Sequence, residues 1–545
     1  MVFMNHANNG GKIKFPFFVS IEALGRKYPA SSIAGWILFS ITVWLVLPIP
    51  LSAQVDTAWV RRYNGPGNAG DYAHYITVDD SGYVYVTGGS WGLGTSYDYA
   101  TIKYYPNGDT AWLRRYNGPA SGNDEGDVVA VDDQGNVYVT GYSDGSGPGN
   151  YCVTIKYYPN GDTAWIRRYD GPASYWNEAF GIAVDDSGNV YVACESIGSG
   201  TSADYATIKY YPNGDTAWVR RYNGPGNGED VVYALAVDNA GCVYVTGGSQ
   251  GSGTNMDYAT IKYDPDGDTV WVRRYNGPGN DYDRAYALKI DSAGNIYVTG
   301  GGQGFGTSLD YTTIKYYPNG DTAWVRRYDG PAVGWDWANA MAIDGSGNVY
   351  VTGESQGLNG SADYATIKYY PNGDTAWIRR YNGPGNDYDR AYAIAVDTSG
   401  GVYVTGGSQG YGTNLDYATI KYYPNGDPAW VMRHNGPANA WDDARWLALD
   451  NVGNVYVTGH GEGTWQDYAT IKYVQTTAIG ENDVHSIKQT TIYATILRGP
   501  LQLPEGKKCR VFDIAGRVVE PDKMKPGIYF VEIDGVVTQK VVKVK

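Results

Sequence analysis

A tryptophan recurs at a fixed interval of 53 residues along most of this 545-residue chain. Each member of the series lies in a copy of AWVRRYNGP or a close variant: Trp59, Trp112, Trp165, Trp218, Trp271, Trp324, Trp377 and Trp430. A constant period of this length indicates one repeated supersecondary unit, and the period must be identified before any local motif is interpreted. The repeat therefore determines the architecture of residues 54–474.

Each copy of the repeat contains four short β-rich runs separated by turn residues. In the copy that begins near Arg390, the runs cover residues 391–397, 402–405, 417–423 and 429–433. Runs of this kind, bounded by Ser-Gly and Asn-Gly turns, predict a four-stranded antiparallel meander. Four-stranded units repeated in this way are typical of a β-propeller, in which each unit forms one blade. We expect an all-β fold with an eight-bladed propeller.

The two ends of the repeat region complement each other. The region opens with a lone AWVRRYNG strand at 58–65 and ends with the run 467–473, after which the next strand is missing. An open solenoid is the alternative, but it would leave two unpaired sheet edges. We therefore predict that residues 58–64 complete an eighth blade formed by residues 445–473.

The recurring tryptophans and charged residues are interpreted as structural. Both faces of a blade meet another blade, so each repeated tryptophan is expected to pack between blades. The Arg-Arg pairs and the lysine of ATIKYY recur in nearly every copy, and charged groups between sheets need partners. The expected partners are aspartates of the VDxxG turns, such as Asp185, Asp238 and Asp397.

Composition limits the classes of partner. A formal net charge of -15 argues against nucleic acid, which is bound by concentrated Lys and Arg.

Cys152, Cys194 and Cys242 stand at different positions of three successive repeats, and Cys509 lies outside them. We expect four unpaired thiols, because nothing in this spacing indicates designed pairing.

The first 53 residues have the pattern of a signal peptide. Basic residues up to Lys27 precede an apolar run at 33–47, and Ala53 offers a small residue at the cleavage point. An uncleaved membrane anchor is the alternative, although the run is slightly short for a spanning helix. After cleavage, we expect no membrane span.

The C-terminal part breaks the repeat pattern. After a linker at 475–487, residues 488–545 contain no tryptophan. Strand-like runs occur at residues 492–497, 509–513, 517–519, 527–533 and 537–544. These runs predict a small separate β-sandwich.

Two resemblances follow from these motifs. GNVYVTG, DYATIKY and GDTAWVRRYNGP resemble the secreted bacterial β-propeller repeat family called SBBP, which implies an extracellular or envelope protein. CRVFDIAGRVV, KPGIYFVEIDG and the terminal QKVVKVK are similar to the C-terminal sorting domain read by the type IX secretion system. This second resemblance implies export across the outer membrane, to the medium or the outer cell surface. A generic accessory sandwich is the alternative.

Variation between the copies is confined to two sets of loops. The VDxxG and YPNGD turns are nearly constant and should share one face, whereas the loops after NGP and before DYATIKY vary and should share the other. The candidate ligand-binding residues on the variable face are Trp91, Trp176, Glu178, Asp283, Trp335, Trp337, Asp389, Trp441, Asp442 and Trp465. Such aromatic and carboxylate groups suit a sugar, a polypeptide or a cation; alternatively, they pack the loops at the rim.

Recognisable catalytic motifs are missing from the sequence. The histidines His74, His434, His460 and His485 are isolated, without zinc-ligand spacing, and we attribute the first three to drift of the repeat. Residues 264–268 resemble only the first half of a calcium loop and lack the distal Glu, which favours a turn. No cofactor and no metal site are expected, although calcium binding is left open.

These observations favour a non-catalytic binding or scaffold protein. The expected partners are an extracellular glycan or protein, together with the type IX secretion machinery. An extracellular polysaccharide hydrolase or lyase is the alternative, with Asp283 and Asp389 as its carboxylates. A purely structural envelope protein is the third hypothesis. Convergence of the candidate residues on a central channel would favour a site, and dispersal would favour scaffolding.

Overall fold

The computed structural model describes residues 54–462, 465–476, 494–497, 501, 509–513, 518–533 and 536–543. The predicted signal peptide and most of the predicted linker lie outside these residues. Within them, no helix is long and apolar enough to cross a membrane.

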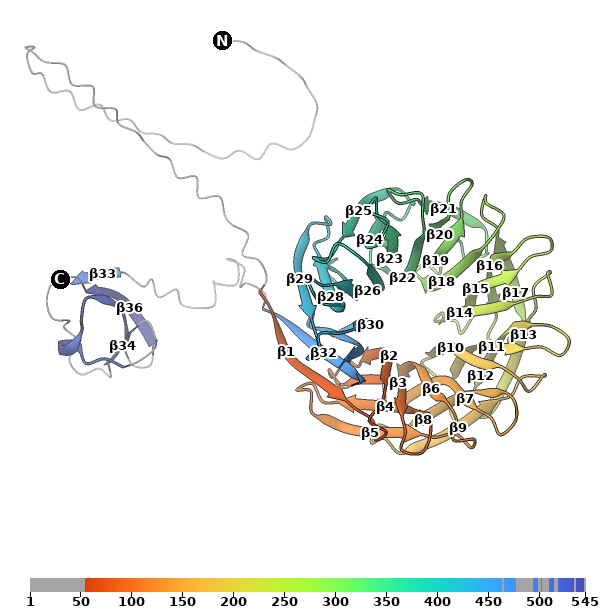
Figure 1. The fold of residues 1–545 in the computed structure, drawn as a ribbon, viewed down its shortest axis with the longest axis horizontal. Coiled ribbons are helices and arrows are strands. Elements are labelled where there is room, and N and C mark those ends of the chain that lie inside the picture. Colours follow the sequence, from red (N-terminus) through yellow and green to blue (C-terminus); the bar gives the residue numbers. More distant parts are fainter. Residues whose placement is uncertain are drawn as a thin grey trace, which may run out of the picture. The chain divides into compact units, whose positions relative to one another are not determined.

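Eight four-stranded sheets form a closed ring (Figure 1). The first four blades are β2 Asp71–Val78, β3 Val84–Trp91, β4 Tyr97–Tyr104 and β5 Thr110–Tyr116; β6 Asp124–Val131, β7 Val137–Asp144, β8 Asn150–Tyr157 and β9 Thr163–Tyr169; β10 Asn177–Val184, β11 Val190–Ile197, β12 Ala203–Tyr210 and β13 Thr216–Tyr222; β14 Asp230–Val237, β15 Val243–Gln250, β16 Met256–Tyr263 and β17 Thr269–Tyr275. In each of these blades the strands pair in chain order, as predicted for a meander.

The remaining blades repeat the arrangement. They are β18 Asp283–Ile290, β19 Ile296–Gln303, β20 Leu309–Tyr316 and β21 Thr322–Tyr328; β22 Asp336–Ile343, β23 Val349–Gln356, β24 Ala362–Tyr369 and β25 Thr375–Tyr381; β26 Asp389–Val396, β27 Val402–Gln409, β28 Leu415–Tyr422 and β29 Pro428–His434; and β30 Asp442–Leu449, β31 Val455–Glu462 and β32 Gln466–Thr476 with β1 Gln54–Tyr63. The first strand of each blade lies innermost in the ring (Figure 1). The eight-bladed propeller is therefore confirmed.

The N-terminal strand closes the ring as predicted. β1 pairs antiparallel with β32, and Trp59 lies opposite Lys472. Trp112 lies opposite Lys103 in the first blade, so β1 occupies the register of an ordinary fourth strand. Because of this closure, no gap with an unpaired strand edge is left between the first and last blades.

The repeated tryptophans lie between blades, which confirms their structural role. All eight are at most 9% exposed. The Nε1 of Trp112 donates to the carbonyl of Pro159 in the next blade at 3.1 Å, and the indole packs against Tyr157 of that blade. Seven of the eight tryptophans fix one blade against the turn after the third strand of the next blade in this way, whereas Trp430 donates to the side chain of Gln475 in the eighth blade.

The predicted partners of the arginines were wrong. The second arginine of a pair, as in Arg115, binds the aspartate of the DYATIKY motif, Asp98, at 2.7 Å. The first, as in Arg114, donates to the carbonyl of Gly161 in the next blade. These partners are closer because both arginines lie on the fourth strand, which pairs with the third strand of its own blade and lies against the turn after the third strand of the next blade.

The VDxxG aspartates instead stabilise their own turns. Asp185 accepts hydrogen bonds from the backbone of Ser187 and Asn189 and from the hydroxyl of Tyr191. One of the expected ion pairs is present, since Nζ of Lys421 lies 3.9 Å from Oδ2 of Asp397. The constancy of this turn therefore reflects local hydrogen bonding.

The prediction of four unpaired thiols was also wrong. A disulfide joins Cys152 of β8 to Cys194 of β11 and links the second blade to the third. In the first blade, the residue equivalent to Cys152 is Tyr99, and the residue equivalent to Cys194 is Gly88. The hydroxyl of Tyr468, another member of the tyrosine series, approaches Gly88 in the same way. A cysteine pair thus replaces a tyrosine and glycine pair at one of the eight blade interfaces.

The C-terminal part forms one mixed sheet among the residues described there. Its order is β33 Ala494–Leu497, β36 Val536–Lys543, β35 Gly527–Ile533 and β34 Cys509–Asp513, with β33 parallel to β36. The expected strand at 517–519 contributes only an isolated bridge from Val518 to Phe512, followed by a 3-10 helix at Pro521–Lys523. The described strands form this single sheet; the second sheet of the predicted sandwich is not among them.

Candidate functional site

The innermost strand of every blade carries a β-bulge at its fourth residue. In β2, Ala73 pairs with Gly88 and Tyr75 with Thr87, so His74 is the extra residue. A bulge re-aims the side chain of the extra residue. The equivalent residues, which we call the bulge ring, are His74, Asp127, Phe180, Tyr233, Tyr286, Asn339, Tyr392 and Arg445.

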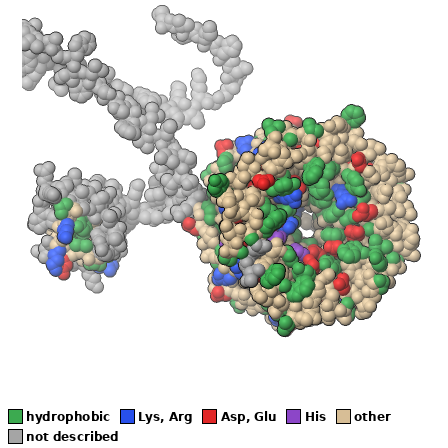
Figure 2. All heavy atoms as spheres, in the orientation of Figure 1, with side chains coloured by type: hydrophobic (Ala, Val, Ile, Leu, Met, Phe, Trp, Pro, Cys, Tyr) green, Lys and Arg blue, Asp and Glu red, His purple; other side chains and the backbone are tan. Residues whose placement is uncertain are grey.

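The bulge ring surrounds the central channel. A cavity of about 500 Å³ is lined by residues of all eight innermost strands, and aliphatic residues such as Leu235, Leu288 and Leu447 are among them. A second cavity of about 510 Å³ includes His74, Tyr392 and Arg445. Figure 2 shows basic, acidic and histidine side chains gathered around the central opening. The bulge ring thus brings polar and aromatic side chains to the wall of the central channel.

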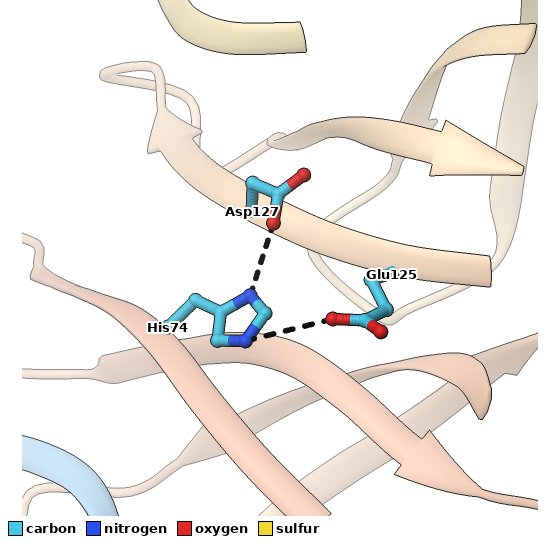
Figure 3. Close-up of side chains that lie close together, drawn as sticks. All are labelled: His74, Glu125 and Asp127. Carbon is cyan, nitrogen blue, oxygen red and sulfur yellow. Dashed lines mark hydrogen bonds and ion pairs between the residues drawn. The ribbon is translucent and has the colours of Figure 1, made fainter. Parts of the chain in front are cut away.

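Three members of this region form a compact cluster (Figure 3). The Nδ1 of His74 lies 3.0 Å from Oδ1 of Asp127, and Nε2 lies 3.7 Å from Oε2 of Glu125. Asp127 is the bulge residue of the neighbouring blade, and Glu125 lies two residues before it on β6. The bulges of two adjacent blades therefore bring a histidine and a carboxylate side by side.

Burial and charge act in opposite directions on this histidine. Burial lowers the pKa of His74, but the hydrogen bond to Asp127 and the negative charges of Asp127 and Glu125 outweigh it, so the pKa is raised. Burial also raises the pKa of Asp127, whereas the hydrogen bond to His74 lowers it. The cluster is an electrostatically coupled unit.

Further carboxylates lie on the same side of the channel. Glu178 of β10 is directly opposite Glu195 of β11. Burial, together with the charges of Asp127, Glu195 and Glu125, raises the pKa of Glu178 to about 8. Burial and the charge of Glu229 raise the pKa of Glu195 to about 7. A substantial fraction of these two groups is therefore protonated at neutral pH.

Positively charged side chains lie near the channel in the seventh and eighth blades. Arg390 pairs with Glu354 at 2.8 Å, and Arg445 pairs with Asp443 at 3.1 Å. The guanidinium of Arg445 also lies over the ring of Tyr392. The channel wall therefore has an acidic side and a side that carries arginines.

An aromatic pocket lies between the fifth and sixth blades, close to the channel. It has a volume of about 490 Å³ and is lined by Tyr282, Arg284, Tyr286, Gly301, Gln303, Ser308, Leu309, Trp335 and Trp337. The rings of Tyr286 and Trp337 are stacked, with centroids 5.7 Å apart and an interplanar angle of 18°. Trp335 is 61% exposed. The pocket combines aromatic faces with an arginine and an amide side chain.

Comparison with known families adds to this description. The model of the family described as Beta-propeller repeat, SBBP, matches residues 112–148 and 335–360. These two segments match the SBBP repeat. They cover parts of the first, second and sixth blades, which all follow the same 53-residue pattern. No curated protein matches the chain in sequence.

Solved structures resemble this propeller only distantly. One is a protein of unknown function from Dyadobacter fermentans, with 9% identity over 77% of this chain and 99% of that chain, and a TM-score of 0.36. Another is the calcium-binding protein regucalcin from Agrobacterium tumefaciens, with 11% identity over 54% and 90% of the two chains and a TM-score of 0.29. Drosophila Plexin A in complex with Semaphorin 1b has 10% identity over 63% and 84% and a TM-score of 0.36. We draw no functional conclusion from such distant likenesses.

Three of the predicted ligand-binding carboxylates lie inside the fold. Asp283, Asp389 and Asp442 are fully buried at the first position of the innermost strand. Asp283 accepts hydrogen bonds from the backbone nitrogens of Gly277 and Gln303, and burial raises its pKa to about 7. These aspartates hold the variable loops in place. The alternative hypothesis of a polysaccharide hydrolase had relied on Asp283 and Asp389, neither of which is exposed to a substrate.

The remaining predicted residues are spread around the variable face. Trp335 and Trp337 converge in the aromatic pocket, and Glu178 belongs to the acidic side of the channel. Trp176, Trp441 and Trp465 are 43%, 53% and 57% exposed on other blades. Trp91 packs against Tyr97 within its own blade. The structure thus brings two of the six predicted tryptophans together.

The bulge ring escaped the sequence analysis. Simple alternation along β2 does not single out His74, because only the bulge re-aims it. A signal was nevertheless present, since the fourth residue of the innermost strand changes its chemical type from copy to copy while Asp71 and Ala73 recur almost unchanged. Variation at this one strand position, between neighbours that stay nearly constant, indicated a functional position as clearly as the variation in the loops did.

The paired glutamates allow a pH-dependent test of stability. Because the folded protein holds a proton on Glu178 more tightly than the unfolded chain, this group destabilises the fold as pH rises from about 4.5 through about 8. We expect Glu178→Gln to change stability little at pH 5 and to stabilise by about 1–2 kcal/mol at pH 9, after allowance for solvent screening. Urea denaturation at both pH values measures this. Asp186→Asn, in an exposed turn, is the control, and an equal effect of Glu178→Gln at both pH values would contradict the expectation.

Proposed function

We propose that this SBBP-type propeller is a non-catalytic binding protein that takes an extracellular carbohydrate in the aromatic pocket. The observation that carries the proposal is the convergence of Tyr282, Tyr286, Trp335 and Trp337 on one cavity. Binding sites for small molecules are concave and largely aromatic, with a few polar groups that fix orientation. Here the aromatic faces would pack on the apolar face of a sugar ring, while Arg284 and Gln303 offer hydrogen bonds to hydroxyl groups.

Export of the protein is part of the same proposal. The sequence pattern of residues 1–53 and the resemblance of the C-terminal part to a type IX sorting domain support a secreted or surface-exposed location. The disulfide between Cys152 and Cys194 is consistent with it, since disulfides persist mainly in oxidising compartments. The type IX machinery would be a transient partner, and the carbohydrate the lasting one.

A glycan array followed by calorimetry tests the pocket. We expect Trp337→Ala to weaken binding of any glycan found by about 10-fold or more, because a stacked aromatic contact and its buried area together exceed about 1.4 kcal/mol. Trp335→Ala should act in the same direction. Trp441→Ala is the matched control, since Trp441 is similarly exposed on the variable face but lies outside the pocket. Equal loss in the control, or unchanged affinity in Trp337→Ala, would refute the assignment.

A further inference from the structure

The cluster of His74, Glu125 and Asp127 has the arrangement of two metal ligands with their orienting partners. The distance of 3.0 Å between Nδ1 of His74 and Oδ1 of Asp127 is that of a hydrogen bond. An aspartate in this position accepts Nδ1–H and leaves the lone pair of Nε2 free, as is usual for histidines that bind metals.

The second distance fits two ligands of one ion. Nε2 of His74 and Oε2 of Glu125 are 3.7 Å apart, which is too long for a hydrogen bond. Metal–ligand bonds of about 2.0–2.2 Å place two ligand atoms of one ion roughly 3.3–3.7 Å apart at ordinary coordination angles. One ligand atom from each of the three residues lies within 4.8 Å of the others.

Glu125 also has an orienting partner. The hydroxyl of Tyr142 donates to its Oε1 at 3.0 Å, which leaves Oε2 directed at the histidine. In the first blade, Gly89 is the residue equivalent to Tyr142, so this hydroxyl is specific to the second blade. Both groups that would contact an ion are thus held by a second residue, an arrangement typical of metal sites.

The surrounding charges favour a cation. The carboxylates of Asp127 and Glu125 place negative charge beside His74, whereas Arg445 is the opposing group whose charge acts on it. His74 lines both channel cavities, so further coordination positions would be open to water or to a ligand in the channel.

We propose that Nε2 of His74 and Oε2 of Glu125 bind a divalent transition-metal ion at the channel wall, with Asp127 and Tyr142 as positioning residues. An imidazole nitrogen with carboxylate oxygen suits Mn²⁺, Co²⁺, Ni²⁺ or Zn²⁺, whereas Ca²⁺ and Mg²⁺ are bound by oxygen ligands. The proposal is independent of carbohydrate binding in the aromatic pocket.

Calorimetry and the visible spectrum of Co²⁺ test the site on untagged, metal-free protein. We expect one ion per chain in titrations with Co²⁺ and Zn²⁺, with a weaker response to Ca²⁺. His74→Asn and Glu125→Gln should reduce the affinity at least 100-fold, and Asp127→Asn about 10- to 100-fold. Thermal unfolding without metal checks that each variant is folded; Asn339 shows that this fold accommodates asparagine at the bulge position.

Two other histidines provide matched controls. His460→Gly introduces the residue that the seventh blade carries at Gly407, and His434→Tyr introduces the one that the sixth blade carries at Tyr381. Both variants should bind Co²⁺ as the unchanged protein does. Absence of stoichiometric binding by the unchanged protein, or binding that His74→Asn leaves intact, would overturn the proposal. Equal loss in His460→Gly would overturn it too, because the ion would then be held elsewhere in the channel.

Discussion

Removal of residues 54–63 is expected to destroy the cooperative unfolding of the propeller. These residues form β1, the only part of the eighth blade that does not come from residues 442–476. Without β1, the edge of β32 loses its antiparallel partner along its length. Trp59 also leaves its cluster with Tyr104 of the first blade and Tyr456 of the eighth.

The expected loss is large because closure holds the first and last blades together. Burial of one large apolar side chain contributes roughly 1.5–3 kcal/mol, so the loss of Trp59, Val60 and Tyr63 alone removes about 5 kcal/mol or more. An unpaired edge on β32 would in addition invite pairing between chains. Calorimetric scanning and light scattering should show a lower, broader transition and concentration-dependent aggregation.

A circular permutant distinguishes the effect of pairing β1 with β32 from the effect of where β1 stands in the chain. The permutant begins at Gly65 and carries residues 54–64 after Thr476 through a flexible linker, so that the same strand returns to the same blade. It should regain most of the stability and unfold in one transition. If the truncated protein unfolds as cooperatively as the unchanged one, closure by β1 contributes nothing and the account given above is wrong.

The closure could be predicted from the sequence because each copy of the repeat shows which strands a complete blade contains. The extra strand before Gly65 and the strand missing after Tyr473 are of the same type, and strand pairing is decided by such local patterns. The strand bounds agree within a few residues where turns are marked by Asn-Gly. β27 extends four residues past the predicted Thr405. Its glycines had indicated a turn, but Gly406 pairs with Ala391 and lies too close to the backbone of Arg390 for a side chain.

The candidate site was harder to predict because it depends on geometry between blades. Asp283 and Asp389 looked available in the sequence, but their carboxylates turn inward to cap the loops. His74 and Asp127 are 53 residues apart, one full period, and only the ring places them side by side. Cys152 and Cys194 escaped for the same reason, since their contact combines the third strand of one blade with the second of the next.

The second large effect is expected at the arginines that join neighbouring blades. Arg115 is 20% exposed and binds Asp98, which is 8% exposed; it also donates to Ser90 and to the hydroxyl of Tyr63 from the preceding blade. Removal of the arginine would leave a buried carboxylate without its cation. Breaking such a pair from one side costs about 3–5 kcal/mol. Arg115→Met should lower stability by that amount in urea denaturation, with the methionine preserving much of the apolar stem.

The second blade supplies a natural control. Its equivalent arginine, Arg168, is exposed and donates to the hydroxyl of Tyr116, and the residue equivalent to Asp98 is Tyr151, which carries no charge to pair with it. Arg168→Met should therefore cost less than about 1 kcal/mol. The double variant Asp98→Asn with Arg115→Met should recover part of the loss, because the uncompensated charge is removed. Equal costs at Arg115 and Arg168 would mean that the arginines stabilise through packing, and the ion pair would then contribute little to holding blades together.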